Sequence, residues 1–311
     1  MSKKLIVGAA AALCLAAITG AVASQQRSDT PAQRGEGMAY ELTGTEVHDL
    51  PDQARNIPYQ LFVSLPASYA DNPQKRYPVV YVTDADYGFA MLRSIGRRMN
   101  NAGPRVEEFI LVGLSYGTGE DPIASRRRDY TPTPRGPSEA PADALHGESL
   151  KYRDYIQRAV FPFVEQRYRT MPDRRVFVGH SYGGLLGAQI LLTRPDMFSR
   201  YLLGSPSLWF DKGYLLKQAP ALLDGRPNLK AKVFMYVGEF EALRKGDRRY
   251  MQEVDMVADN AAFSAMLRAR QYPGLELNDE VLDGEDHLSV APRGFTHGLL
   301  DLLPAAEASR K

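Results

Sequence analysis

The chain has very little cysteine and no surplus of charge of either sign. Its 311 residues include one Cys and one Trp. A single cysteine excludes an internal disulfide framework and a cysteine-rich zinc site, and a chain of this length can be stabilised by a hydrophobic core alone. Lys and Arg total 38 against 37 Asp and Glu, so no basic surplus is present to neutralise a run of phosphates. We therefore expect no nucleic-acid partner.

Long hydrophobic runs are also lacking, except at the N-terminus. Two lysines precede an apolar run from Leu5 to Ala23, which closes with the small-residue triplet Ala21-Val22-Ala23. This order is typical of a secretory signal peptide, so we expect residues 1–23 to be cleaved and the protein to be periplasmic or secreted. The alternative is a membrane anchor, because the run approaches the length that spans a bilayer. After cleavage, we expect no stable insertion into a membrane.

The rest of the chain is predicted to form one α/β domain. Residues 24–38 are polar and without periodicity, which predicts a flexible lead-in, and residues 306–311 form a tail. Between them, residues 39–305 alternate strand and helix patterns, which predicts a mostly parallel central sheet with helices on both faces. Strands are expected near 59–65, 77–82, 109–113, 175–178, 201–203, 233–237 and 280–282, and helices near 88–100, 149–168, 185–192, 251–267 and 292–303.

One segment breaks the alternation. Residues 118–147 are rich in proline, contain the triplet Arg126-Arg127-Arg128 and have few aliphatic residues. A long excursion of this kind in a compact α/β domain is more often a functional surface loop or lid than a domain linker. We therefore expect a loop without regular structure here.

The pentapeptide Gly-x-Ser-x-Gly occurs twice. In α/β hydrolases this motif forms a strained turn between a strand and a helix, which lifts the serine hydroxyl above the sheet. Residues 179–183 and residues 113–117 both match it, and both follow an apolar strand. Only Ser181 is followed by a helical run, whereas Ser115 leads into a polar, proline-containing stretch. Ser181 is therefore the predicted nucleophile, and Ser115 is predicted to be the polar end of a strand.

A serine hydroxyl needs a base within hydrogen-bond reach, and histidine has a suitable ordinary pKa. Of the five histidines, His287 lies in the loop between the last predicted strand and helix, which is the place of the base in the order Ser, acid, His. His180 adjoins Ser181, but the tight turn should direct it away from the attacking side. The others lie before the core strands, in the long loop or inside the last helix: His48, His146 and His297.

The acid of the site is expected just after the strand at 233–237. Two carboxylates, Glu239 and Glu241, follow there, and either would hold the tautomer of the imidazole and stabilise the imidazolium. We favour Glu241, three residues beyond Gly238; Asp283 and Asp286 are more remote alternatives.

An oxyanion hole needs two backbone donors. The first is the N–H of the residue after the nucleophile, Tyr182. The second should come from the loop after the third strand of the fold, residues 83–87, where position alone suggests Ala85 or Asp86; we take Ala85.

These motifs resemble the family of α/β hydrolases that contains esterase D and the enterochelin or siderophore esterases. The resemblance extends over most of the chain after residue 23 and is carried by RYPVVYVTDAD at 76–86, RRRDYTPTP at 126–134, VGHSYGGLLG at 178–187, SPSLWF at 205–210 and GEDH at 284–287. The exported siderophore esterases look most similar. The resemblance implies an α/β-hydrolase fold, Ser181 and His287 as catalytic residues, and the RDYTP segment beside the pocket.

The sequence thus predicts a metal-independent serine esterase that needs no cofactor and acts on a small-molecule ester. We expect the substrates to be siderophore-type lactones or aryl esters. The side chains that would offer guanidinium and aromatic surfaces to a phenolic or anionic molecule are Arg126, Arg128, Tyr130, Tyr182 and Trp209. The alternative for the arginines is a solvated basic loop. Two other functions stay open: an acyltransferase or peptidase using the same serine, and a non-catalytic exported binding protein.

Overall fold

The computed structural model describes Gly37, residues 39–137 and residues 140–306. Backbone contacts divide the chain into two units, residues 1–43 and residues 44–311. In the first unit, the described residues form no helix or strand. The expected signal peptide lies outside the described residues, as do the end of the expected tail and all of the expected lead-in but Gly37.

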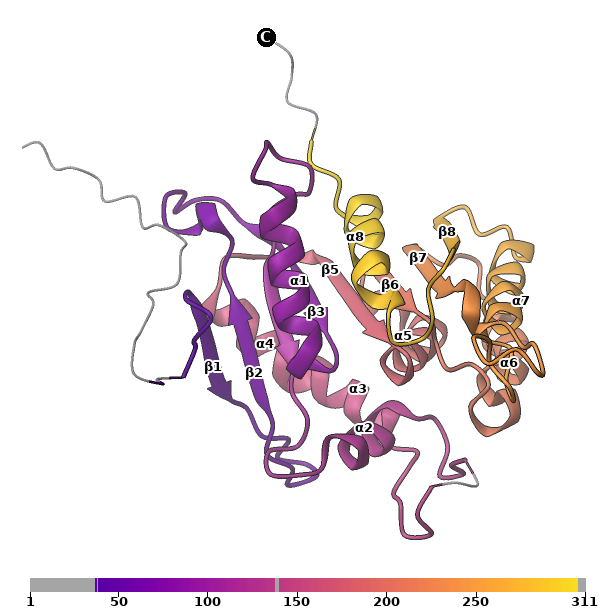
Figure 1. Cartoon of the computed structure of the whole chain (residues 1–311). Coiled ribbons are helices and arrows are strands. Elements are labelled where there is room, and N and C mark those ends of the chain that lie inside the picture. The colour runs from indigo at the N-terminus through magenta and orange to yellow at the C-terminus, as the bar shows by residue number, and fades with distance from the viewer. Residues whose placement is uncertain (1–36, 38, 138–139, 307–311) are drawn as a thin grey trace, which may run out of the picture. The chain divides into compact units, whose positions relative to one another are not determined.

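An eight-stranded sheet forms the centre of the second unit (Figure 1). The strand order is β1-β2-β4-β3-β5-β6-β7-β8. Strand β2 is antiparallel to both of its neighbours, and every other adjacent pair in this order is parallel. The strands are β1 (Thr45–Asp49), β2 (Gln60–Ser64), β3 (Tyr77–Val82), β4 (Ile110–Leu114), β5 (Thr170–His180), β6 (Arg200–Gly204), β7 (Ala231–Gly238) and β8 (Leu275–Leu282).

Helices cover both faces of this sheet (Figure 1). Helices α1 and α8 pack on one face, and α3, α4, α5, α6 and α7 pack on the other. The helices are α1 (Ala85–Met99), α2 (Pro122–Tyr130), α3 (Ser149–Tyr155), α4 (Phe161–Arg167), α5 (Tyr182–Thr193), α6 (Phe210–Leu223), α7 (Met256–Ala269) and α8 (Val290–Leu302). Shorter turns are η1 (Ala67–Tyr69), the π-helical η2 (Ile156–Val160), η3 (Pro195–Met197) and η4 (Glu239–Glu241).

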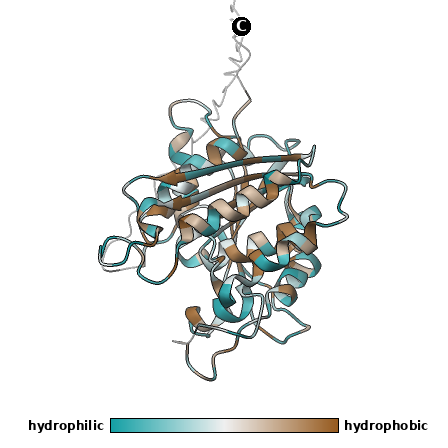
Figure 2. Ribbon diagram, turned by 90° about the vertical axis from the view of Figure 1, so that its right-hand side faces the viewer, coloured by the Kyte–Doolittle hydropathy of each residue, from teal (hydrophilic) through white to brown (hydrophobic). Residues whose placement is uncertain are grey.

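The central strands are apolar because they are covered on both sides. Neighbouring residues of one strand enter opposite cores: Phe177 packs with the larger helical layer, and Val178 packs with α1 and α8. This follows from the two-residue period of a β-strand. Figure 2 shows hydrophobic colour along the strands, while the helices carry both hydrophobic and hydrophilic residues. The arrangement is the α/β-hydrolase fold that the sequence predicted.

The prediction that residues 118–147 form a loop without regular structure was wrong. Helix α2 lies within this segment. The Asp121 side chain accepts a hydrogen bond from the N–H of Ala124, and Pro122 occupies the first turn. Both are favourable helix starts. The helix has no apolar stripe, since ion pairs join its inner side to other elements: Arg126 with Asp84, and Asp129 with Arg55. Hydrophobic periodicity therefore could not reveal it.

Three further differences from the expected helices and strands were found. The helix predicted at 251–267 begins at Met256, because the Asp255 side chain caps it by accepting the N–H of Ala258. Strand β1 and helix α6 were not expected; α6 contains left-handed backbone at Asp211–Gly213 and a proline in its interior. No helix in the described part of the chain is both long enough and apolar enough to cross a membrane.

Candidate active site

Ser181 occupies a sharp turn between β5 and α5. Its backbone has φ 60° and ψ −120°, a left-handed conformation that L-residues rarely adopt. Its N–H donates to the Gly204 carbonyl at 2.9 Å, which ties the turn to the neighbouring strand β6. The first residue of α5, Tyr182, follows directly. This is the elbow that the Gly-x-Ser-x-Gly pattern predicted.

The two glycines of the motif are required by close approach. A Cβ on Gly179 would lie 2.3 Å from the Gly183 carbonyl oxygen. One on Gly183 would lie 2.2 Å from Oγ1 of Thr83, in the loop between β3 and α1. The turn therefore packs too tightly for any side chain at either position, and the loop after β3 is brought against the start of α5.

His287 faces Ser181 from the loop between β8 and α8. Its Nε2 is 3.0 Å from Ser181 Oγ, and its Nδ1 is 2.7 Å from Oε2 of Glu241. Because a carboxylate only accepts, Nδ1 carries the hydrogen and Nε2 is left to accept from the serine hydroxyl. The histidine side chain is 24% exposed and the glutamate side chain is fully covered. The three groups thus lie in the order that proton transfer from Ser181 requires.

Glu241 is a buried carboxylate with three hydrogen-bond donors. Oε1 accepts from the N–H of Gly238 at 2.8 Å and from the Ser205 hydroxyl at 2.6 Å, while Oε2 faces His287. The turn η4 returns the carboxylate towards the end of β7 and so holds it in place. A buried charge is tolerated when its lone pairs are satisfied in this way.

Glu239, the competing acid, points elsewhere. Its carboxylate accepts from the Tyr250 hydroxyl at 3.0 Å and from the N–H of Gly284 at 2.9 Å. These two donors, with the Gly284 N–H the stronger influence, lower the pKa of Glu239. The structure therefore brings Glu241 to His287, and Glu239 holds the loop that carries His287. Asp286 accepts from backbone N–H groups of its own loop, at Leu288 and Ser289.

Two serines that the sequence analysis did not single out complete the surroundings. Ser205 and Ser207 follow β6, within the SPSLW segment, and both are buried. Ser205 adopts φ 38° and binds Glu241, as described above. Ser207 Oγ lies 3.3 Å from Ser181 Oγ, and its N–H donates to the Ser181 carbonyl at 3.2 Å. Because the proton of Ser181 faces His287, the Ser207 hydroxyl is the donor between the two serines. In the sequence, the position of these two serines in the SPSLW segment, directly after the predicted strand at 201–203, was the feature that could have indicated them.

The two predicted oxyanion donors begin helices. Tyr182 is the first residue of α5 and Ala85 is the first residue of α1. The first N–H groups of a helix have no acceptor within it. The residue before Ala85, Asp84, has a left-handed backbone, and its N–H donates to the Tyr130 hydroxyl at 3.3 Å. The assignment of Tyr182 and Ala85 stays a prediction.

The second serine motif has a structural place. Ser115 follows the end of β4, is 8% exposed, and its hydroxyl accepts from the N–H of Gln60 and donates to the Tyr116 carbonyl. No helix follows it directly, because α2 begins at Pro122. Three other histidines form hydrogen bonds to groups other than Ser181. His48 contacts Glu46 and Tyr168, His146 contacts the Ala144 carbonyl, and His297 contacts Glu280.

Arg126, predicted to contact substrate, forms a buried ion pair. Its guanidinium donates to the Asp84 carboxylate, with Nε at 3.0 Å from Oδ1, and Asp84 also accepts from the Tyr116 hydroxyl at 2.6 Å. Burial opposes the charge of Arg126, but the Asp84 carboxylate more than offsets it, so the pKa of Arg126 is raised. The guanidinium carbon also lies 5.3 Å from the centre of the Tyr182 ring. Arg126 therefore links α2 to the loop after β3.

Two further residues of the predicted substrate surface are buried by the protein itself. Tyr130 is 1% exposed, and its ring packs 5.6 Å from that of Tyr152, a position that does not fit a contact with substrate. Arg128 is paired with Glu120 at 2.7 Å and with Asp129 at 2.9 Å. The sequence predicts a surface location for both residues because hydrophobic patterning cannot distinguish a polar network in the interior from a solvated loop.

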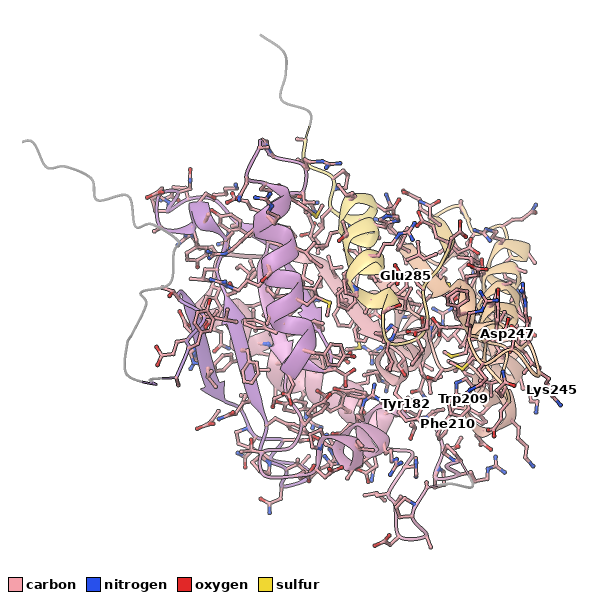
Figure 3. The ribbon with its side chains drawn as sticks, in the orientation of Figure 1. Tyr182, Trp209, Phe210, Lys245, Asp247 and Glu285 are labelled. Atoms are coloured by element: carbon pink, nitrogen blue, oxygen red, sulfur yellow. The ribbon has the colours of Figure 1, made fainter. Side chains whose placement is uncertain are left out.

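Trp209 remains accessible beside Ser181. Figure 3 shows Tyr182, Trp209 and Phe210 together, and their ring centres are 5.8–6.4 Å apart. Trp209 also lines an open pocket of 470 Å³ whose other residues include Lys212, Leu216, Lys217 and Asp259. Neither lysine forms an ion pair with any residue that the structure describes. Through Trp209, the aromatic surface next to the elbow borders a pocket whose lining carries both charges, Lys212 and Lys217 together with Asp255 and Asp259.

The fold, and a serine held at its elbow within reach of a histidine, define the class: the protein is a carboxylic ester hydrolase of the α/β-hydrolase fold. The chain belongs to the family described as "Putative esterase", whose model matches residues 53–278. This confirms the resemblance found in the sequence.

Similar proteins agree with this assignment. The chain is 30% identical over 270 residues to ferri-bacillibactin esterase BesA of Bacillus subtilis (strain 168), covering 83% of this chain and 89% of that protein. It is 28% identical to siderophore enterobactin esterase of Emericella nidulans, covering 73% of this chain and 78% of that protein. Among solved structures, an IroE-like serine hydrolase from Shewanella oneidensis superposes with a TM-score of 0.70 at 26% identity, over 82% of this chain and 79% of the other.

Proposed function

We propose that this protein is an exported serine esterase that hydrolyses siderophore-type lactones or aryl esters through an acyl-enzyme on Ser181. The observation that carries the proposal is the continuous set of hydrogen bonds from Ser181 through His287 to Glu241. A hydroxyl, an imidazole and a buried carboxylate in this order form the arrangement used for nucleophilic acyl transfer.

The reaction follows from the proton positions. His287 Nε2 takes the proton of Ser181 as Oγ attacks the ester carbonyl, and Glu241 stabilises the imidazolium that forms. The N–H groups at the starts of α5 and α1, at Tyr182 and Ala85, are proposed to stabilise the oxyanion. Collapse of the tetrahedral intermediate passes the proton to the leaving alcohol and leaves an acyl-Ser181. Water, deprotonated by His287, then releases the acid and restores Ser181.

The substrate class is supported by the relatives and by charge near the elbow. Two of the similar proteins are named as esterases of the siderophores bacillibactin and enterobactin. The guanidinium of Arg127 forms no hydrogen bond or ion pair with the residues that the structure describes. Its positive charge, with that of Arg126, opposes the effect of burial that raises the pKa of Tyr182. With the rings of Tyr182 and Trp209 beside it, Arg127 makes this side of Ser181 suited to an anionic aromatic molecule.

The test of the mechanism is labelling with a fluorophosphonate, followed by peptide mass spectrometry. We expect an adduct on Ser181 and none on Ser115, which has the same sequence motif and therefore serves as the matched control. Ser181→Ala should abolish hydrolysis of aryl esters and catecholate siderophore lactones, whereas Ser115→Ala should keep it. An adduct on Ser115, or full turnover by Ser181→Ala, would contradict the proposal.

Export is a separate part of the proposal and rests on the sequence of residues 1–23. Cell fractionation combined with N-terminal sequencing of the mature protein tests it. We expect a chain that begins near Ser24 in the periplasm or the medium. Full-length protein retained in the cytoplasm would exclude export without affecting the assignment of the esterase.

A further inference from the structure

The imidazole ring of His180 lies next to that of His287. His180 is the last residue of β5, immediately before Ser181, and is only 7% exposed. The centres of the two imidazole rings are 4.8 Å apart, and on its other side His180 stacks on the ring of Tyr236 at 6.0 Å and 14°. A polar ring is therefore enclosed between the histidine of the site and a tyrosine of β7.

The partners of His180 determine which of its ring nitrogens donates and which accepts a hydrogen bond. Nε2 lies 3.0 Å from the carbonyl oxygen of His287, and a carbonyl can only accept, so Nε2 carries the hydrogen. In the neutral ring Nδ1 is then an acceptor, and the Tyr236 hydroxyl lies 3.3 Å from it. Burial, followed by the charge of His287, lowers the pKa of His180 to about 3. Burial also raises the pKa of Tyr236 well above its usual value, so Tyr236 stays a donor.

Tyr236 has a fixed place in the packing. A Cβ on Gly204, in the adjacent strand β6, would lie 2.1 Å from the Tyr236 hydroxyl oxygen. A Cβ on Gly294, in α8, would lie 2.5 Å from its ring. The Tyr236 ring therefore fills the space that the missing side chains of Gly204 and Gly294 leave, and this close packing holds it beside His180.

We propose that His180 is a positioning residue that holds the main chain of His287, so that the strand carrying Ser181 also fixes the histidine that deprotonates it. The inference rests on the proposed function, in which His287 is the base. The rest of the loop is anchored at its neighbours, where the Glu285 carbonyl accepts from Phe240 and the Gly284 N–H donates to Glu239. The bond from His180 is made to His287 itself. It keeps Nε2 of His287 in reach of Ser181 Oγ.

Two substitutions of His180 test the donor. His180→Phe keeps a ring and removes the donor, and we expect kcat to fall by about 10–100-fold with little change in KM, because a displacement of about 1 Å at a catalytic group is enough for such a loss. His180→Gln can place an N–H near the position of Nε2, and we expect it to recover most of kcat. Equal kcat in wild type and a folded His180→Phe would overturn the proposal, as would a loss that Gln does not recover at all.

Tyr236→Phe tests the direction of the chain of hydrogen bonds. Without the tyrosine donor, His180 can place its hydrogen on Nδ1, which would set a lone pair of Nε2 against the His287 carbonyl. We expect nitrogen NMR to find the Nε2–H tautomer in wild type and a share of the Nδ1–H tautomer in Tyr236→Phe. An Nδ1–H tautomer in wild type would overturn the proposal even if the His180 variants do not fold.

A double-mutant cycle separates this role from general packing. If Tyr236 acts through His180, its substitution should lower kcat in the wild-type background and have no further effect in His180→Phe. Tyr201→Phe is the matched control, because its buried hydroxyl also makes a hydrogen bond, to the Pro195 carbonyl, and should leave kcat unchanged. If the losses of kcat in His180→Phe and Tyr236→Phe add in the double variant, Tyr236 does not act through His180, which would overturn this part of the proposal. Failure of wild type to label at Ser181 would instead contradict the proposed function.

Discussion

Oε2 of Glu241 lies 2.7 Å from Nδ1 of His287, although the two residues are 46 positions apart in the chain. The other oxygen of the same carboxylate is held by Gly238 and Ser205. The carboxylate of Glu241 is therefore held through both of its oxygens, while the other candidate for the acid, Glu239, is bonded to Tyr250 and Gly284.

Replacement of the two glutamates should separate their roles. Glu241→Gln keeps the shape but removes the charge that favours the imidazolium, so we expect kcat to fall by about 10²–10⁴-fold. Glu239→Gln is the matched control and should stay within a few-fold of wild type. Steady-state kinetics on an aryl ester measure both. Greater loss in Glu239→Gln than in Glu241→Gln would reverse the assignment of the acid.

Loss of the Ser205 hydroxyl should weaken both stability and activity. Ser205→Ala removes one of the two donors to Oε1 of buried Glu241, and a hydrogen bond to a charged group contributes about 1.5–3 kcal/mol. We expect the unfolding free energy to fall by that amount and kcat to fall several-fold. Ser149→Ala, which also removes a buried hydroxyl bonded to a side-chain oxygen, that of Gln189, should lower stability but not kcat. Unchanged kcat in Ser205→Ala would show that one donor suffices.

The two neighbouring arginines should respond differently to substitution. Arg126→Gln breaks the ion pair with the buried carboxylate of Asp84. We therefore expect the free energy of unfolding to fall by about 3 kcal/mol. Arg127→Gln removes no hydrogen bond or ion pair to the described residues, so its melting temperature should not change. We expect KM for an anionic catecholate ester to rise in Arg127→Gln and KM for a neutral ester to stay the same. Equal changes for both esters would exclude a charge-selective role.

The buried imidazole of His180 should make folding sensitive to acid. Its folded pKa of about 3 lies below the ordinary value of 6.5, so the unfolded chain binds a proton that the folded chain does not. The stability linked to neutral His180 is complete above pH 6.5 and is lost as the pH falls towards 3. Between pH 6.5 and pH 5, wild type should lose about 2 kcal/mol relative to His180→Gln. Denaturant titrations of wild type and His180→Gln at several pH values measure this difference. The same dependence of unfolding free energy on pH in both proteins would contradict the expectation.

Several features followed from the sequence alone because they depend on local sterics and patterning. Apolar runs covered on both faces predict the central strands, and the α/β-hydrolase fold was confirmed. The glycines at 179 and 183 predict the tight turn at Ser181, since no side chain fits there. Motif order placed His287 after the last strand, and the family resemblance was confirmed by the match over residues 53–278.

Other features depended on contacts between distant segments, which no local pattern contains. Which of Glu239 and Glu241 lies against the His287 imidazole depends on which side of the turn η4 faces the His287 loop. The pairing of Arg126 with Asp84, 42 positions away, was decided by the packing of α2 near the loop after β3. The position of His180 beneath His287 likewise needs β5, β7 and the β8–α8 loop to meet. In each case the side chain's partner, and so its role, is determined by how the folded chain brings distant residues together.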